Sequence, residues 1–298
     1  MNKPTLYIMT GLSGSGKSSV AAEIASIYPD TVIVSSDAIR EELTGNYKDQ
    51  EHNEKVFKIF HDRIRKILEN KKIVIADATN LTMKSRRAIM MKVNGLNIRK
   101  VCVVIPKPFE LCKEDNLHRK YPVPNSVLDK QIRRFQIPFY EEGFDDIQVI
   151  PFEKHTDMLK VIHNMKNFDQ KTPWHDKTLG NHCLQVAELF SNCSYGEKYE
   201  LPAICHDIGK LFTQSFDENG VAHYYGHPEY GSYLMLSNFH GFFEGLTDGD
   251  ILDMCFLVNY HMLPFDWNTD KSKEKWKKIF GEYKYQMLLD FNKCDKVR

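Results

Sequence analysis

The feature that most constrains this chain is the segment from Gly11 to Ser18, which reads Gly-Leu-Ser-Gly-Ser-Gly-Lys-Ser. It fills every fixed position of the pattern Gly-x4-Gly-Lys-Ser/Thr, which holds nucleotide phosphates between a strand and a helix. The apolar run 6–9 precedes the segment and the helical run 19–25 follows it. Backbone N–H groups and Lys17 would face the β- and γ-phosphates, and the Ser18 hydroxyl would bind Mg²⁺. We therefore expect ATP, or another nucleoside triphosphate, to bind with Mg²⁺ at Gly11, Ser13, Gly14, Ser15, Gly16, Lys17, Ser18 and Ser19.

Composition limits the other possibilities. The length of 298 residues is typical of two domains, and 40 basic residues balance 40 acidic residues. Without an overall positive charge, any bound nucleic acid must be held by a local patch or at an end. The seven cysteines contain no C-x-x-C pair, and no signal-peptide profile or long apolar run is present. These observations predict reduced thiols, a cytoplasmic location and no membrane span.

The first half alternates between short apolar runs and helical stretches. Further apolar runs occupy residues 31–34, 72–76 and 101–105, and a strongly amphipathic stretch covers 51–70. Such alternation predicts an α/β domain, with helices on both faces of a parallel sheet. Ligands of these sheets bind beyond the carboxyl ends of the strands, so the residues after each strand are the candidates for chemistry.

Polar residues follow two of these predicted strands. Asp37 comes after the second strand and Arg40 lies one helical turn later, where they would accept a hydroxyl proton and hold an anion. The alternative is an ordinary helix N-cap at residue 36 or 37 with a solvated arginine. After the third strand, Asp77 would orient the Mg²⁺ water shell and Thr79 and Asn80 would contact substrate, or the three would form a simple turn.

A basic segment that ends in Arg119 and Val123-Pro124 would form a lid, with Arg119 neutralising charge on the transferred phosphoryl group. Together these motifs resemble the P-loop 5′-polynucleotide kinases over about residues 5–150. The resemblance implies that Asp37 is the general base for a 5′-OH and that Arg40 binds the neighbouring phosphate. Arg119 takes the place of the lid arginine. Where the family often has another arginine, this chain has Glu114-Asp115, which leaves Arg133 and Arg134 as substitutes. Small-molecule kinases share this scaffold.

The second half differs in composition and pattern. Nine of the twelve histidines lie beyond residue 150, and from residue 179 the pattern is helical throughout. We place a P-loop kinase-like domain at 1–152, a linker helix at 153–167 and an all-α domain at 168–298, because the polar stretch 167–173 ends in proline.

A spaced set of histidines and aspartates runs through this second domain. His182 lies in one predicted helix, His206-Asp207 in another and Asp295 at the end of a terminal helix. Imidazole and carboxylate ligands from several helices can converge on one divalent ion, although a single helical histidine is more often an ordinary core or surface residue.

The H…HD…D set resembles the HD phosphohydrolase superfamily over about residues 168–298. Further matches are Pro173-Trp174-His175, Ile208-Gly209-Lys210, 225–229, Asn259-Tyr260-His261 and 292–295. The resemblance implies one metal on His182, His206, Asp207 and Asp295, with His227 and His261 able to add a second ion. Asp290 is a fallback for Asp295, whereas His223 and His240 are bystanders. Mn, Ni, Co, Zn or Fe would suit these ligands.

Lys210 follows Asp207 by three residues, and it would neutralise a phosphate oxygen or protonate a leaving group. The alternative is a lysine at a helix C-terminus, where the helix dipole favours it.

Two phosphate chemistries in one chain predict a bifunctional enzyme that heals nucleic-acid ends. The kinase would phosphorylate a 5′-OH, and the HD domain would open a 2′,3′-cyclic phosphate or remove a 3′-phosphate. RNA is favoured over DNA because only RNA forms the cyclic phosphate through its 2′-OH. A separate RNA ligase is the expected partner. The alternatives are a small-molecule or nucleoside kinase fused to a nucleotide phosphohydrolase, and a hydrolase regulated by a nucleotide-sensing P-loop domain. A deoxynucleotide triphosphohydrolase with a decayed kinase is disfavoured by the presence of Lys17, Asp37, Arg40 and Arg119.

Overall fold

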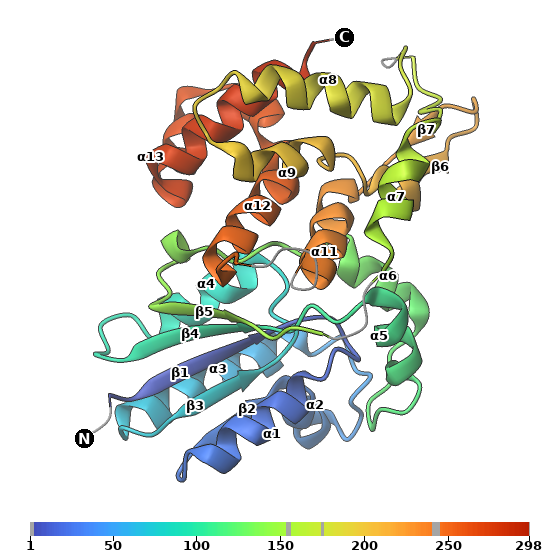
Figure 1. The fold of residues 1–298 in the computed structure, drawn as a ribbon. Helices are drawn as coiled ribbons and strands as arrows, with labels where there is room; N and C mark the ends of the chain where they lie inside the picture. The colour runs from blue at the N-terminus through green and yellow to red at the C-terminus, as the bar shows by residue number, and fades with distance from the viewer. Residues whose placement is uncertain (1–2, 153–155, 174–175, 240–244, 298) are drawn as a thin grey trace. The chain divides into compact units, whose positions relative to one another are not determined.

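The computed structural model describes residues 3–152, 156–173, 176–239 and 245–297. Trp174 and His175 of the resemblance and the expected bystander His240 lie outside these residues. The chain forms two compact units, one made of residues 1–131 and 142–151 and the other of residues 132–141 and 152–298 (Figure 1). No helix in the described ranges is both long enough and apolar enough to cross a membrane.

The first unit is built on a five-stranded, fully parallel sheet in the order β2-β3-β1-β4-β5. The strands are β1 (Thr5–Thr10), β2 (Val32–Ser35), β3 (Val74–Asp77), β4 (Arg99–Val104) and β5 (Asp146–Val149). This arrangement confirms the predicted α/β class and the four predicted strands. The strand β5 was not predicted, because polar residues alternate with its two buried ones and no apolar run marks it.

Both faces of the sheet are buried, as period-two alternation requires when helices cover each side. Tyr7 and Met9 pack with Ala21 of helix α1, while Leu6 and Ile8, which point to the opposite face, are also fully buried. The helices of this unit are α1 (Lys17–Ile27), α2 (Ser36–Thr44), α3 (Asn53–Glu69), α4 (Met83–Lys92), α5 (Phe109–Asn116) and α6 (Asn125–Ile132).

A fully buried ion pair fixes the turn between β3 and α4. Arg86 and Glu142 are both inaccessible to solvent, and Arg86 Nη2 lies 2.6 Å from Glu142 Oε1. Arg86 Nη1 also donates to the carbonyl oxygens of Asn80 and Leu81. Because a buried charge must be paired and hydrogen-bonded, this contact rigidly connects the end of β3 to the chain that leads into β5.

The second unit is helical, as predicted. Its helices are α7 (Met158–Met165), α8 (Leu179–Ser191), α9 (Glu200–Ile204), α10 (Lys210–Thr213), α11 (His227–Phe239), α12 (Asp248–Tyr260) and α13 (Asp270–Asp295). The expectation of a purely helical domain is corrected by a two-stranded antiparallel ribbon, β6 (Ser215–Phe216) and β7 (Ala222–His223). Strands of two residues are too short to show an alternating pattern, and only the turn chemistry around Gly220, where φ is 76°, marks the hairpin.

Segment 132–141 packs within the second unit, although it connects two elements of the first. Phe139 is buried and makes edge-to-face contacts with the rings of Phe256, Tyr260 and Phe280. Asn259 holds the backbone of the segment, with Nδ2 donating to the Phe135 carbonyl oxygen at 2.9 Å. The core of the second unit therefore includes residues that precede β5 in the chain.

Candidate nucleotide site and metal centre

The phosphate loop connects β1 to α1, and its shape requires glycine at Gly14. The φ angle there is 81°, and an added Cβ atom would lie 2.2 Å from the carbonyl oxygen of Cys112. Lys17 is buried beside the loop, and its Nζ donates to the Leu12 carbonyl oxygen at 2.6 Å. Burial lowers the pKa of Lys17 to about 8. A triphosphate in the loop would supply negative charge to this desolvated ammonium group.

Two hydroxyl groups of the loop fit a nucleotide with its Mg²⁺ ion. Ser18 Oγ donates to Asp77 Oδ2 at 3.0 Å. A hydroxyl and a carboxylate oxygen therefore lie side by side, and Mg²⁺ prefers oxygen ligands of this kind. Ser15 Oγ is buried without a hydrogen-bond partner. A buried hydroxyl of this kind calls for a ligand, and a phosphate oxygen would satisfy it.

Gln131 of α6 is a contact of the loop that the sequence analysis missed. Its Oε1 accepts from the Ser13 backbone N–H at 2.8 Å, and its Nε2 donates to Ser13 Oγ at 3.0 Å. This pair of bonds ties the loop to α6 at Ser13, so a phosphate contact of that residue would compete with Gln131. Only the fold brings the two positions together, since they are 118 residues apart in the chain.

Asp37, Arg40 and Arg119 form one cluster. Arg40 Nη1 donates to Asp37 Oδ1 at 3.0 Å, and Arg119 Nη2 lies 3.7 Å from Asp37 Oδ2. Ser35 caps α2 by accepting from the backbone N–H of residue 38, so the N-cap alternative does not account for Asp37. Arg40 is buried and also donates to Asn53 Oδ1 at 2.8 Å, a partner that the sequence analysis did not identify. The arginines leave the carboxylate partly exposed to solvent.

Two other sequence expectations for the first unit are corrected. The Asn80 side chain is buried, and its Nδ2 donates to the Met9 carbonyl oxygen at 2.8 Å, so it closes the turn instead of facing a substrate. Arg133, considered as a substitute lid arginine, donates from Nη1 to the Tyr225 carbonyl oxygen at 2.8 Å within the second unit.

The second unit brings together all six residues that were expected to bind metal. His182 lies on α8, His227 begins α11, His261 follows α12 and Asp295 ends α13. His206 and Asp207 lie in the turn between α9 and α10, whereas one continuous helix was expected there.

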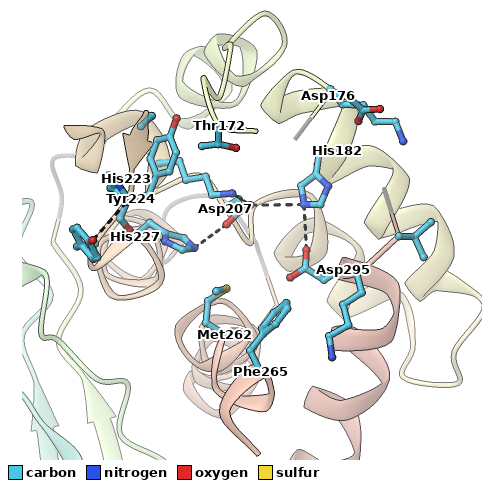
Figure 2. A pocket seen from close by; sticks show the side chains of 16 residues that line it. Thr172, Asp176, His182, Asp207, His223, Tyr224, His227, Met262, Phe265 and Asp295 are labelled. Atoms are coloured by element: carbon cyan, nitrogen blue, oxygen red, sulfur yellow. Dashed lines mark hydrogen bonds and ion pairs between the residues drawn. The ribbon is translucent and has the colours of Figure 1, made fainter. Parts of the chain in front are cut away.

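Asp207 lies at the centre of this cluster, as Figure 2 shows. Its Oδ1 is 2.9 Å from His227 Nε2 and 3.6 Å from His261 Nε2. Its Oδ2 is 3.4 Å from His206 Nε2 and 3.8 Å from His182 Nε2. Each oxygen of one carboxylate therefore faces a different pair of histidines.

The protonation of three of these rings shows why the cluster fits metal ions. His206, His227 and His261 each direct Nδ1 to a backbone carbonyl oxygen at 2.8 Å, and a carbonyl can only accept, so Nδ1 carries the proton. In its neutral form each ring directs an Nε2 lone pair at carboxylate oxygens, and all three Nε2 atoms are buried without a hydrogen-bond partner among the described residues. A cation between these nitrogen and carboxylate lone pairs would stabilise them. A hydrogen bond from Nδ1–H is also the usual way in which proteins orient a histidine that binds metal through Nε2.

The donor atoms form three overlapping groups, of which one, His206, His261 and Asp295, links the two subsites described next. His182, His206 and Asp207 form one group, to which Asp295 Oδ1 adds at 3.1 Å from His182 and 3.3 Å from His206. Asp207, His227 and His261 form the second group. Nitrogen and carboxylate donors of this kind suit Mn, Ni, Co, Zn or Fe, and Asp207 would be shared if both subsites hold an ion.

Lys210 belongs to this centre as a support for Asp207. Its buried Nζ lies 2.6 Å from Asp207 Oδ2 and donates to Gln170 Oε1 at 2.9 Å. Burial opposes ionisation of Asp207, but the charge of the Lys210 ammonium group beside it holds the pKa of its carboxyl well below its usual range. Lys210 begins α10, so the helix C-terminal alternative is wrong. Asp290 accepts from the Tyr195 hydroxyl at 2.7 Å and does not join the cluster.

A cavity of about 580 Å³ opens onto the metal centre. Its walls include His182, Asp207, His227 and Asp295, so a ligand in the cavity would reach both subsites (Figure 2). His223, considered a bystander, also lines the cavity. The volume is within the range of small-molecule binding sites.

Several known proteins are similar to parts of this chain. Residues 6–138 match the family described as "AAA domain". The chain is 29% identical over 182 residues to L-seryl-tRNA(Sec) kinase of Methanococcus maripaludis, covering 56% of this chain and 71% of that protein. It is 29% identical over 91 residues to the bifunctional polynucleotide phosphatase/kinase of Schizosaccharomyces pombe, covering 29% of this chain and 22% of that protein.

Among solved structures, a chain of the Pnkp1/Rnl/Hen1 RNA repair complex is 23% identical, with a TM-score of 0.40. That comparison covers 45% of this chain and 44% of the other. The present chain thus spans less than half the length of the chain in that complex, and less than half the length of the fission-yeast relative. The phosphate loop, the parallel sheet and the sequence matches together identify the first unit as a P-loop kinase-like domain.

Proposed function

We propose that this chain heals broken nucleic-acid ends, with RNA as the expected substrate. The observation that supports the proposal is the presence of a phosphate loop and a cluster of metal-ligand residues in one chain. The phosphate loop lies beside the Asp37, Arg40 and Arg119 cluster, and the metal-ligand residues are the histidines and aspartates around Asp207. The polynucleotide phosphatase/kinase relative supports a polynucleotide as the acceptor.

In the kinase reaction, a 5′-hydroxyl oxygen bonds to the γ-phosphorus of ATP, the bond from that phosphorus to the bridging oxygen breaks, and ADP leaves. Asp37 takes the hydroxyl proton, because its carboxylate is exposed enough to meet substrate while Arg40 holds it in place. Arg40 is anchored by Asn53 and binds the neighbouring phosphate of the strand. Arg119 neutralises charge on the transferred group.

In the second reaction, water breaks one of the two ester bonds of a 2′,3′-cyclic phosphate, or the single ester bond of a 3′-phosphate. Divalent ions held by the cluster would lower the pKa of a bound water and supply hydroxide at neutral pH. Asp207 presents one oxygen to each subsite, and Lys210 fixes its orientation. Opening the cyclic phosphate leaves a phosphate monoester on one oxygen and a hydroxyl on the other, whereas hydrolysis of a 3′-phosphate releases inorganic phosphate and leaves a 3′-hydroxyl. A 5′-phosphate and a free 3′-hydroxyl are the ends that a ligase joins, and a separate RNA ligase is the proposed partner.

A second acceptor class is favoured by the relative that aligns over more than half of this chain, the L-seryl-tRNA(Sec) kinase. The serine hydroxyl of an aminoacyl-tRNA is also an alcohol, and the same base and phosphate loop would serve it. A small-molecule acceptor remains the third possibility, because the scaffold alone does not select the substrate.

The test is a gel assay of the purified chain with ATP, Mg²⁺ and Mn²⁺. The substrate is a short RNA with a 5′-OH and a 2′,3′-cyclic phosphate, and the two ends are scored separately. Conversion of both ends is the expected result. If ATP is consumed and neither end changes, the end-healing proposal fails, and seryl-tRNA and mononucleoside acceptors are tested in competition with the RNA.

A further inference from the structure

The cavity at the metal centre has an aromatic wall that the proposed chemistry does not use. His223 and Tyr225 both line it, and their rings are parallel, with an angle of 2° between planes and 5.5 Å between centroids. Figure 2 shows His223 on the same side of the cavity as His227. The Tyr225 side chain is 71% exposed. What distinguishes Tyr225 from most other exposed rings of the described residues is that it lines the cavity that opens onto the metal centre.

Contacts within the unit hold this pair of rings in place. His223 Nε2 lies 3.3 Å from Asp217 Oδ2, and Tyr225 OH is 3.5 Å from His223 Nδ1. Arg133 donates to the Tyr225 carbonyl oxygen, and an added Cβ at Gly226 would lie 2.7 Å from Arg133 Cβ. Since His223 faces Asp217, it is not available as a ligand of the metal centre. The rings are therefore a fixed surface at the wall of the cavity.

The charged groups of the cavity indicate an anionic ligand. Lys177 donates to the neutral amide of Gln185 at 2.6 Å, and Lys296 lies over the Phe265 ring at 5.0 Å. Neither lysine has a carboxylate partner in the part of the chain that the structure describes. The lining also holds Lys210, which is paired with Asp207, and two further aspartates, Asp176 and Asp295, of which Asp295 belongs to the metal centre. Phosphate groups next to the scissile one would meet Lys177 and Lys296.

We propose that Tyr225, stacked on His223, is a platform for the nucleobase of the substrate, and that the metal centre acts on phosphates carried by nucleotides. This inference rests on the proposed hydrolase function and specifies its substrate class. Every nucleobase offers a π-face, so an aromatic platform binds a nucleotide end without selecting its sequence. A sugar phosphate lacking a base would reach the metal centre but lose this contact.

The test compares two substrates of the full chain loaded with Mn²⁺. They are adenosine 2′,3′-cyclic monophosphate and methyl riboside 2,3-cyclic phosphate, which lacks the base. We expect kcat/KM to be about 5- to 100-fold higher for the nucleotide, as stacking on an aromatic side chain implies. Tyr225→Ala should reduce this ratio towards one, and Tyr225→Trp should keep it. Phe216→Ala, which removes an exposed ring of the same hairpin outside the cavity wall, is the matched control.

An unchanged ratio in Tyr225→Ala, or an equal loss for both substrates, would overturn the platform. If the wild-type chain hydrolyses neither substrate, the proposed hydrolase function fails, and calorimetric binding of adenosine 3′-monophosphate and ribose 5-phosphate decides the inference separately. A preference for the nucleotide that Tyr225→Ala abolishes would support the platform. Equal binding of the two compounds, or a preference that Tyr225→Ala leaves intact, would refute it.

Discussion

Gly209 packs directly against the backbone of His227, so that a Cβ atom added to Gly209 would lie 2.0 Å from the His227 carbonyl oxygen. The same atom would lie 2.8 Å from the backbone nitrogen of Gly231. Gly209 has an ordinary helical φ of −64°, so the requirement for glycine is steric and not conformational. This contact sets the distance between α10, which begins with Lys210, and α11, which begins with His227.

Replacing Gly209 by alanine should therefore force α10 and α11 apart and separate His227 Nε2 from Asp207 Oδ1. We expect Gly209→Ala to destabilise the second unit by about 1–3 kcal/mol, as overpacking does, and to weaken Mn²⁺ binding. Calorimetry and thermal unfolding measure the two effects. The control is Gly249→Ala, whose Cβ would meet its nearest atom at an ordinary 3.6 Å and which should not destabilise the protein. Equal behaviour of the two variants would contradict the argument.

Asp37→Asn should abolish 5′-phosphorylation and leave phosphohydrolysis intact. The amide keeps the shape of the side chain but cannot accept the hydroxyl proton, so the rate should fall by about 10²- to 10⁴-fold. Asp30→Asn, at an exposed turn before β2, is the control. Asp207→Asn should abolish phosphohydrolysis and leave 5′-phosphorylation intact. The two-site description is wrong if either Asp37→Asn or Asp207→Asn removes both activities from a folded protein.

The sequence predicted the parts of the fold that local patterns encode. Apolar runs marked four strands, and the phosphate loop marked the junction of β1 and α1. The strand β5 was missed because Asp146 and Gln148 occupy alternate positions, and β6 and β7 were missed because each has only two residues. Packing determines these elements, so local patterns do not show them.

The candidate sites were likewise predictable where local patterns encode them and not where packing places them. The residue types around Asp207 were predictable from their spacing and from the resemblance to a known superfamily. The division of its two oxygens between two pairs of histidines was not, because it depends on how α8, α11 and α12 are placed. The contacts of Gln131 with the phosphate loop and of Asn53 with Arg40 were not predicted for the same reason, since side-chain amides belong to no motif of their own.

Metal binding should stabilise the second unit, because the cluster gathers carboxylate oxygens and histidine Nε2 atoms that a cation would bind. At a Mn²⁺ concentration 100 times the dissociation constant, the expected gain is about 2.7 kcal/mol, and EDTA should remove it. Asp295→Asn should reduce the shift in unfolding temperature. Asp290→Asn, on the same helix but bonded to Tyr195, should not. An unfolding temperature that is insensitive to Mn²⁺ and EDTA would refute the metal assignment.

Segment 132–141 should be required for the stability of the second unit, because Phe139 fills a pocket between three buried rings. Phe139→Ala removes these contacts and leaves a cavity, at a cost of about 3–5 kcal/mol. The neighbouring Tyr140 is 45% exposed, so Tyr140→Ala is the matched control and should change stability little. Hydrogen exchange at α12 amides reports on the second unit alone. If Phe139→Ala leaves this exchange unchanged, the segment does not contribute to that core. If the exchange accelerates, then residues 152–298 do not contain a complete second unit, and fragments that begin there should unfold at lower temperature than the full chain.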